Sequence, residues 1–285
     1  MKKVLEFLKK QPLITAVIGV AVSVGAISLL RCDNYFVEGL LRVILSMAMC
    51  TSLYLISGTK TFDHCEKTTG YVIKRLSGFI IFTLVLTVLM GVLTILVTRF
   101  AGKDAVPMQL QKNIPLQFII NTFLFFFVGL FEELAFRAVI NDGIVYQFRN
   151  KKSVFAASAV ISSFIFGWVH IMSADVSEPL LFAQAALKTL STGLYGFGFL
   201  ILYWKTRNIW ACGIAHGLYD FFASITGCIF VTEEQTGDTY VRTGVQGVAG
   251  TVVLIFNLIL NLILVIHVWK KVGKTIDFEE MRKSW

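Results

Sequence analysis

The stretch Asn121–Asp142, NTFLFFFVGLFEELAFRAVIND, is an apolar run long enough to cross a lipid bilayer, yet it contains three charged residues close together. About 20 mainly apolar residues suffice for a transmembrane helix. A charge at the bilayer centre costs about 3 kcal/mol or more. Glu132, Glu133 and Arg137 must therefore face protein or water, which predicts a buried polar site within a membrane bundle.

The composition of the whole chain agrees with this class. Hydrophobic residues make up 56% of the 285 residues, charged residues only 15%, and the mean hydropathy is +0.73. Soluble domains carry roughly 25% charged residues. We predict an all-α polytopic membrane protein with about eight transmembrane helices in one bundle, and residues 1–285 as a single membrane domain. The predicted spans lie near residues 12–30, 37–58, 76–98, 115–140, 153–172, 180–204, 208–230 and 245–269.

The distribution of basic residues predicts the orientation. With the N-terminus in the cytoplasm, 18 Lys and Arg residues fall in inner segments and 5 in outer segments. This bias is typical of cell-membrane proteins with both termini cytoplasmic. Because the basic residues flank apolar runs, the net charge of +8 indicates the lipid bilayer, not nucleic acid, as the partner. Arg42 and Lys188 lie within two turns of a span end, and snorkelling explains them.

Helical spacing separates the roles of the two adjacent glutamates. Glu133 and Arg137 are four residues apart and can form an ion pair on one helix face. A structural ion pair would account for these two residues. It does not account for Glu132, which lies one position round the helix and is free to point into a cavity.

Two later spans carry histidines at positions that can meet these acids. His170 ends a face of small residues in FIFGWVHIMS, so it is expected to face the bundle. His216 and Asp220 are four residues apart, so the carboxylate can orient the imidazole. Each histidine alone is explained by a structural hydrogen bond. Glu132 and His170, however, lie 19 residues on either side of Lys151, where the chain turns, so they meet at one height. Together these groups favour catalysis or ion handling.

Three ordered motifs resemble those of the CPBP family, the CAAX prenyl proteases and bacteriocin-processing (Abi-like) intramembrane endopeptidases. The motifs are EExxxR at Glu132, Glu133 and Arg137, FxxxH at Phe166 and His170, and HxxxN or HxxxD, here with Asp, at His216 and Asp220. The resemblance covers about residues 115–230, which we take as the catalytic core.

The resemblance implies an eight-helix bundle with a cavity open to the cytoplasmic side. It also implies hydrolysis of a peptide bond in a membrane-associated protein or peptide, of which prenylated CAAX tails are one class. Glu132 would be the general base that activates water, with Glu133, Arg137 and Phe166 in support. His170 and His216 would stabilise the oxyanion or place the water, and Asp220 would fill the last position of the third motif.

Other chemistries use the same residues. Glu132, His170 and His216 could hold a catalytic zinc ion with an open position for water, although the resemblance favours glutamate chemistry without a metal. A proton-coupled transporter could use the acids and histidines as a relay, but the matching pair of broken helices typical of transporters is not seen in the sequence. A non-catalytic bacteriocin-immunity or scaffold protein would not need intact catalytic motifs.

Overall fold

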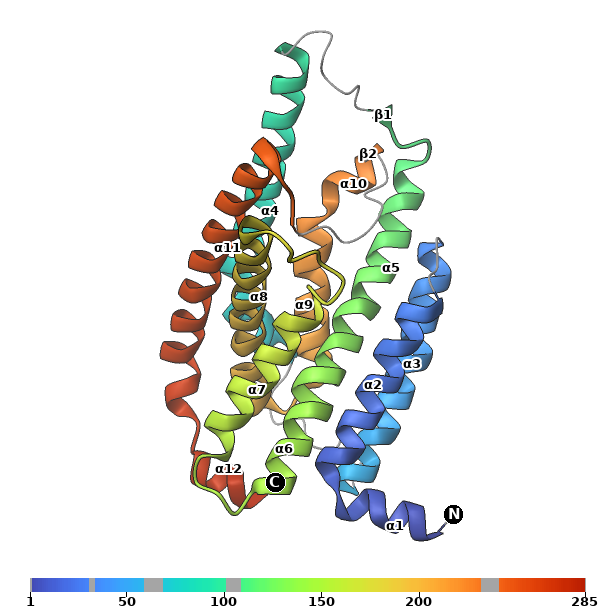
Figure 1. Ribbon diagram of the computed structural model, residues 1–285, viewed down its shortest axis with the longest axis vertical. Coiled ribbons are helices and arrows are strands. Elements are labelled where there is room, and N and C mark those ends of the chain that lie inside the picture. Colours follow the sequence, from blue (N-terminus) through green and yellow to red (C-terminus); the bar gives the residue numbers. More distant parts are fainter. Residues whose placement is uncertain (1, 31–33, 59–68, 101–108, 232–240, 285) are drawn as a thin grey trace.

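The computed structural model describes residues 2–30, 34–58, 69–100, 109–231 and 241–284, which form a helical bundle and one short two-stranded sheet (Figure 1). The all-α membrane architecture predicted from the sequence is confirmed. The elements are α1 (Lys2–Lys10), α2 (Pro12–Leu30), α3 (Tyr35–Ser57), α4 (Thr69–Phe100), β1 (Gln109–Leu110), α5 (Ile114–Glu133), the π-helix η2 (Leu134–Ile140), α6 (Asn141–Phe148), α7 (Val154–Val169), α8 (Pro179–Thr206), α9 (Ile209–Ala223), α10 (Ile225–Ile229), β2 (Phe230–Val231), α11 (Gly244–Lys271), the 3-10 helix η3 (Gly273–Thr275) and α12 (Phe278–Ser284).

The predicted spans can be compared with these helices one by one. Each of the eight runs coincides with a helix, and α5, η2 and α6 together form one continuous rod. Within the described residues, six helices are long and apolar enough to cross a membrane. The helices α7 and α9, with 16 and 15 residues, are shorter. The count of eight spans therefore stays a prediction.

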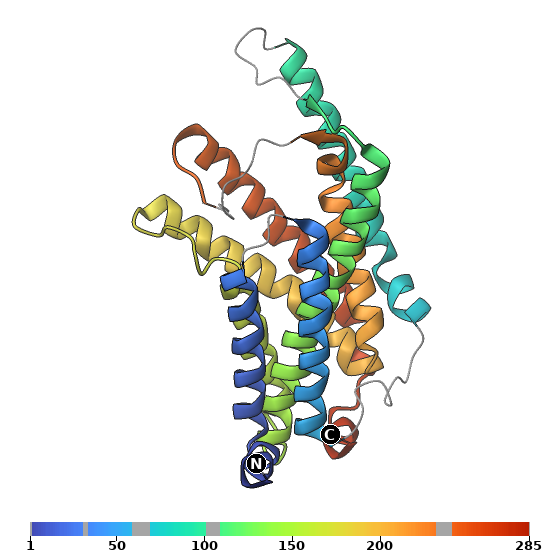
Figure 2. The ribbon, with the colours of Figure 1, turned by 90° about the vertical axis from the view of Figure 1, so that its right-hand side faces the viewer.

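Both chain ends lie at the same end of the bundle (Figures 1 and 2). We call this end, with α1, the α6–α7 turn and α12, the terminal end, and the opposite end the distal end. At the terminal end, α12 packs back onto the bundle: the ring of Phe278 lies 5.4 Å from that of Phe155 and 5.8 Å from that of Trp204. An even number of crossings is the simplest way to bring both ends together.

Asparagines begin several helices. The side chains of Asn34, Asn113 and Asn208 accept hydrogen bonds from the free backbone N–H groups that open α3, α5 and α9. Arg207, just before Asn208, makes the tight turn between α8 and α9 in a left-handed conformation with φ of 50°. Its guanidinium forms an ion pair with Asp142 at 3.3 Å. Burial alone would lower the pKa of Arg207. The neighbouring Asp142 and Tyr203 raise this pKa by more than burial lowers it, so the guanidinium stays charged.

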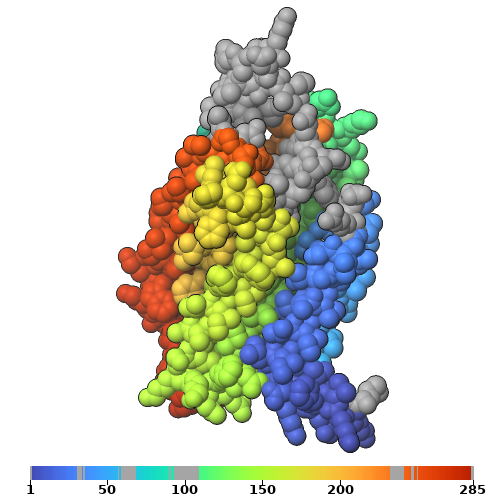
Figure 3. Space-filling model, in the orientation of Figure 1, coloured from blue at the N-terminus to red at the C-terminus, as the bar shows by residue number. Residues whose placement is uncertain are grey.

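The two halves of the bundle differ in packing. Residues 133–145 are all buried, and so are residues 198–204 of α8, so the half toward the terminal end has a dense core. Figure 2 shows α8 and α11 leaning away from α4 and α5 toward the distal end. On the face seen in Figure 3, α2, α7, α8 and α11 form most of the surface.

Glycines bring α5 and α9 into backbone contact. A Cβ added at Gly129 would lie 2.5 Å from the backbone nitrogen of Gly217, and one added at Gly217 would lie 2.6 Å from the carbonyl oxygen of Phe125. Small residues allow membrane helices to approach this closely. The approach places the end of α5, with its two glutamates, directly beside His216 of α9.

Candidate active site

The two adjacent glutamates occupy different environments at the end of α5. The Glu133 side chain is fully buried, whereas the Glu132 side chain is 18% exposed and lines a cavity. The π-helix η2 begins at the next residue, Leu134. Such turns recur at functional sites because they change the direction in which neighbouring side chains point. The difference in environment predicted from helical spacing is present.

His216 contacts three carboxylates from two helices. Its Nδ1 lies 2.8 Å from Oε1 of Glu133, and its Nε2 lies 3.4 Å from Oδ2 of Asp220 and 3.6 Å from Oε2 of Glu132. A carboxylate can only accept hydrogen bonds, so Nδ1 carries a proton and donates a hydrogen bond to Glu133. Nε2 also faces carboxylate oxygens, which accept hydrogen bonds, so it can act as a second donor next to the cavity.

His170 presents a hydrogen-bond acceptor to the cavity, whereas His216 presents a donor. Its Nδ1 lies 2.7 Å from the carbonyl oxygen of Phe166, one helical turn earlier. A carbonyl oxygen can only accept, so this nitrogen carries the proton. The neutral ring then presents the lone pair of Nε2, which lies 3.9 Å from Oε2 of Glu132. Glu132 therefore lies between an acceptor nitrogen and a donor nitrogen.

Arg137 stabilises the buried side of the site. Its guanidinium lies 3.2 Å from Oε1 of Glu133 and 3.8 Å from the ring centroid of Phe166, in a cation–π arrangement. A side chain at Gly196 would meet Nη2 of Arg137 at 2.9 Å, so this glycine makes room for the guanidinium. The predicted pair of Glu133 and Arg137 is present, but the same carboxylate oxygen also accepts from His216.

These groups meet at a polar cavity of about 420 Å³ between α3, α5, α7, α8, α9 and α11. We call it the polar cavity. Glu132, Phe166, His170, His216 and Asp220 all line it. Glu133 and Arg137 lie behind it in the protein interior. The structure thus brings all seven sequence-predicted site residues to one place.

Two residues of the polar cavity were misjudged from the sequence. Arg42 and Lys188 line it, so snorkelling to a membrane surface is not a sufficient account of either. Arg42 pairs with Glu38, also a lining residue, at 2.6 Å. The signal was available: Glu38 and Arg42 are four residues apart in an apolar run. Asn261 lines the cavity too and donates a hydrogen bond to the backbone oxygen of Ser191 at 3.1 Å.

Comparison with known proteins identifies the part of the chain that contains this site. Residues 114–222 match the family of type II CAAX prenyl endopeptidase Rce1-like proteins. The match confirms the resemblance to the CPBP and CAAX-protease family. No curated protein and no solved structure matches the chain.

The Rce1-like segment runs from the start of α5 almost to the end of α9. It contains all three motifs, so the similarity to CAAX-type proteases covers the parts of the polar cavity on α5, α7, α8 and α9. The parts of the polar cavity on α3 and α11 lie outside it. Arg42 and Asn261 therefore line the polar cavity from helices outside the matched segment.

The Rce1-like site has the ligand types for zinc: the nitrogens of His216 and His170 that face Glu132 lie 3.6 and 3.9 Å from its Oε2. Ligands of a tetrahedral zinc ion, each about 2.0–2.3 Å from the metal, lie roughly 3.3–3.8 Å from one another, so the His216 separation fits and the His170 separation is wider. Among the residues that the structure describes, no three His, Cys, Asp or Glu side chains are placed to hold a metal ion.

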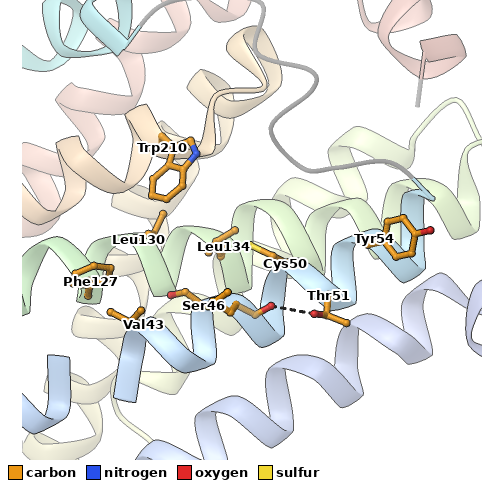
Figure 4. Close-up of a pocket in the computed structure, with 10 residues that line it drawn as sticks. Val43, Ser46, Cys50, Thr51, Tyr54, Phe127, Leu130, Leu134 and Trp210 are labelled. Carbon is orange, nitrogen blue, oxygen red and sulfur yellow. Dashed lines mark hydrogen bonds between the residues drawn. The ribbon is translucent and has the colours of Figure 1, made fainter. Parts of the chain in front are cut away.

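A second hollow lies beside the Rce1-like site, on another face of α3 and α5 (Figure 4). This groove of about 640 Å³, which we call the apolar groove, is lined by Val43, Ser46, Met47, Cys50, Thr51, Tyr54, Phe127, Leu130, Leu134 and Trp210. Among these described residues there is no histidine or carboxylate. The apolar groove therefore offers contact area but no acid–base chemistry.

Proposed function

We propose that the protein is an intramembrane endopeptidase in which Glu132 activates water for attack on a peptide carbonyl. The observation that carries the proposal is the position of Glu132: it is open to the polar cavity and lies between two imidazoles of opposite hydrogen-bonding polarity. Glu133, one residue on, is buried and already engaged by His216 and Arg137. Glu132 is thus the glutamate available to take a proton.

The residues divide the reaction between them. A water molecule donates one hydrogen to Glu132 and the other to Nε2 of His170, and its oxygen attacks the carbonyl carbon. The proton passes to Glu132, and Nε2–H of His216 donates to the developing oxyanion. When the intermediate collapses, the C–N bond breaks and Glu132 returns the proton to the leaving amine. Preorganised donors and a positioned base are the two requirements of this chemistry.

Glu133, Arg137 and Asp220 act as positioning residues in this proposal. Glu133 holds Nδ1–H of His216, and Arg137 balances the charge of Glu133. Asp220 lies 3.4 Å from Nε2 of His216 and keeps that nitrogen directed at the cavity. The resemblance allows Asn as well as Asp at this position. We therefore expect Asp220→Asn to retain more activity than Asp220→Ala.

The substrate class follows from the surroundings. The polar cavity has room for a short extended peptide and lies within a bundle of apolar, lipid-facing helices. A membrane-associated protein or peptide, with prenylated CAAX tails as one class, is the proposed substrate. Residues 115–230 are proposed as the catalytic core.

The test is cleavage by the purified protein in liposomes, with a library of farnesylated and unmodified peptides in water enriched in ¹⁸O. Hydrolysis places one ¹⁸O atom in each new carboxylate, which mass spectrometry detects. Glu132→Gln should abolish cleavage, whereas the matched control Glu280→Gln, an exposed residue of α12, should not affect it. Full activity of Glu132→Gln would contradict the proposal. Activity that is lost to a chelator and restored by zinc would favour the zinc mechanism.

A further inference from the structure

With α5, η2 and α6 taken as one rod, the residues that line the polar cavity lie in the middle of each contributing helix or toward its distal end. On α5 they run from Leu124 to Glu132, the later part of a helix that starts at the distal end, with none on η2 or α6. On α3, Glu38 and Arg42 lie in the first two turns, at the distal end. On α7, His170 directly follows the last residue, also toward the distal end.

The remaining helices repeat the pattern. On α9, which runs toward the distal end, the lining begins at His216 and continues past the end of the helix to Ser224. On α8, which starts at the distal end, it extends from Lys188 only as far as Tyr195. On α11 it ends at Asn261. The polar cavity thus extends from the level of Glu132 toward the distal end.

The other direction is closed by packed side chains. Exposure along the central rod falls from 18% at Glu132 to 0% at Glu133 and 2% at Arg137. The rings of Phe166, Tyr195 and Phe199 lie 6.2, 5.1 and 5.4 Å from that of His216 and fill the space beneath it. All three rings are buried. A substrate therefore has no open route to Glu132 from the terminal end through the described residues.

The charge distribution assigns the two ends to the two sides of the membrane. Basic pairs flank the helices at the terminal end: Lys9 and Lys10, Lys151 and Lys152, and Lys270 and Lys271. In the topology predicted from the sequence, 18 basic residues fall in inner segments and 5 in outer segments. By the positive-inside rule the terminal end is cytoplasmic, and the distal end faces outward.

From these observations we infer that the polar cavity opens to the extracytoplasmic side, so that the substrate is a membrane-attached peptide segment presented from the outer leaflet. The substrate part of this inference rests on the proposed function. Glu132 lies about 27 Å along the helix from Ile114 and about 24 Å from Phe148, near the middle of the rod. The segment must therefore reach to mid-membrane depth. This direction is opposite to the cytoplasm-facing cavity that the family resemblance implies.

The opening can be tested without any measurement of proteolysis. In a variant without native cysteines, Ser224→Cys places a thiol on the wall of the polar cavity, and Ser153→Cys places one on the exposed α6–α7 turn as a matched control. A charged, membrane-impermeant maleimide added to spheroplasts should label Cys at position 224 and not at position 153. Inverted vesicles should give the reverse pattern. Labelling of position 224 from the cytoplasmic side, or none even in detergent, would overturn the inference.

The substrate side needs a second experiment. A lipid-anchored, membrane-impermeant peptide that the enzyme cleaves in detergent should be cut when added to spheroplasts and spared when added to inverted vesicles. Cleavage only in inverted vesicles would overturn the inference and leave the glutamate mechanism standing. Labelling of position 224 from outside, together with full activity of the Glu132→Gln variant, would support the inferred opening and contradict the proposed function.

Discussion

The polar cavity and the apolar groove lie on different faces of the same helices, α3 and α5, and α9 contributes to both. The apolar groove is the larger, at about 640 Å³ against about 420 Å³. The polar cavity nevertheless contains all the carboxylate, imidazole, ammonium and guanidinium groups that line either hollow: Glu38, Arg42, Glu132, His170, Lys188, His216 and Asp220. Charged groups at membrane depth are costly. A functional site in this bundle is therefore recognised by the free-energy cost of burying the charged groups that line it, not by its volume.

The largest effect should come from removing the charge that holds the buried side of the polar cavity together. Glu133→Gln leaves Arg137 without its carboxylate, and an uncompensated buried charge costs about 3–5 kcal/mol. We expect a lower melting temperature in detergent. Arg137→Gln in the same chain should recover part of the loss, because the unpaired charge is then gone. The measurement is a double-mutant cycle on thermal unfolding. Strictly additive effects of the two substitutions would disprove the coupling.

The next effect concerns the proposed oxyanion donor. His216→Ala should lower kcat by about 10²–10³-fold, as loss of one donor to an oxyanion does. His267, an exposed histidine of α11, provides the matched control, and His267→Ala should leave kcat unchanged. Steady-state cleavage in liposomes measures both variants. Equal activities for the two would remove His216 from the mechanism.

A smaller effect is expected where α5 and α9 touch. Gly129→Ala forces a methyl group against the backbone of Gly217, and overpacking of this kind costs about 1–3 kcal/mol. The separation of the two helices should also move His216 away from Glu133 and lower activity. Gly78→Ala is the control, because no described atom lies within 4 Å of a Cβ placed there. If both variants unfold at the same temperature, the close approach is not needed for stability.

The smallest effect is expected in the apolar groove. Cys50→Ala removes the only thiol among its described lining residues and should leave kcat and KM close to those of the unmodified protein. Cleavage kinetics with lipid-anchored and free peptides provide the measurement. A raised KM for the lipid-anchored peptide alone would show that the groove holds part of the substrate, and the contrast between the two hollows would then no longer hold.

Much of this architecture could be read from the sequence because two signals in it are strong. Long apolar runs specify where helices form, and every predicted run contains one. Charges within such runs need partners, which singled out Glu132, Glu133 and Arg137. The 19-residue spacing about Lys151 also identified the partner helix of His170. These inferences depend only on helix length and on the cost of burying charge.

The remainder depends on three-dimensional offsets that no local pattern encodes. The hydrogen bond between His216 and Glu133 joins residues 83 positions apart on helices with independent tilts. Position near a span end made snorkelling a reasonable account of Arg42 and Lys188, because the sequence does not show that a cavity extends to their level. The π-helix η2 also gives no periodic signal, since one extra residue in a long rod barely disturbs the pattern.

That extra residue has a consequence for how such a chain can change over generations. Loss of a single codon within 134–140 would remove the extra residue that the wider π-helical turn accommodates and restore an ordinary α-helix, with little change in the direction or length of the rod on either side. Beyond the π-helix, Asn141 and Asp142 anchor the rod to Ser158, Trp204 and Arg207. The two glutamates directly precede the π-helix. Gain or loss of one residue here would therefore change which side chains of residues 134–140 face the site, Arg137 among them, while the glutamates and the anchor keep their places.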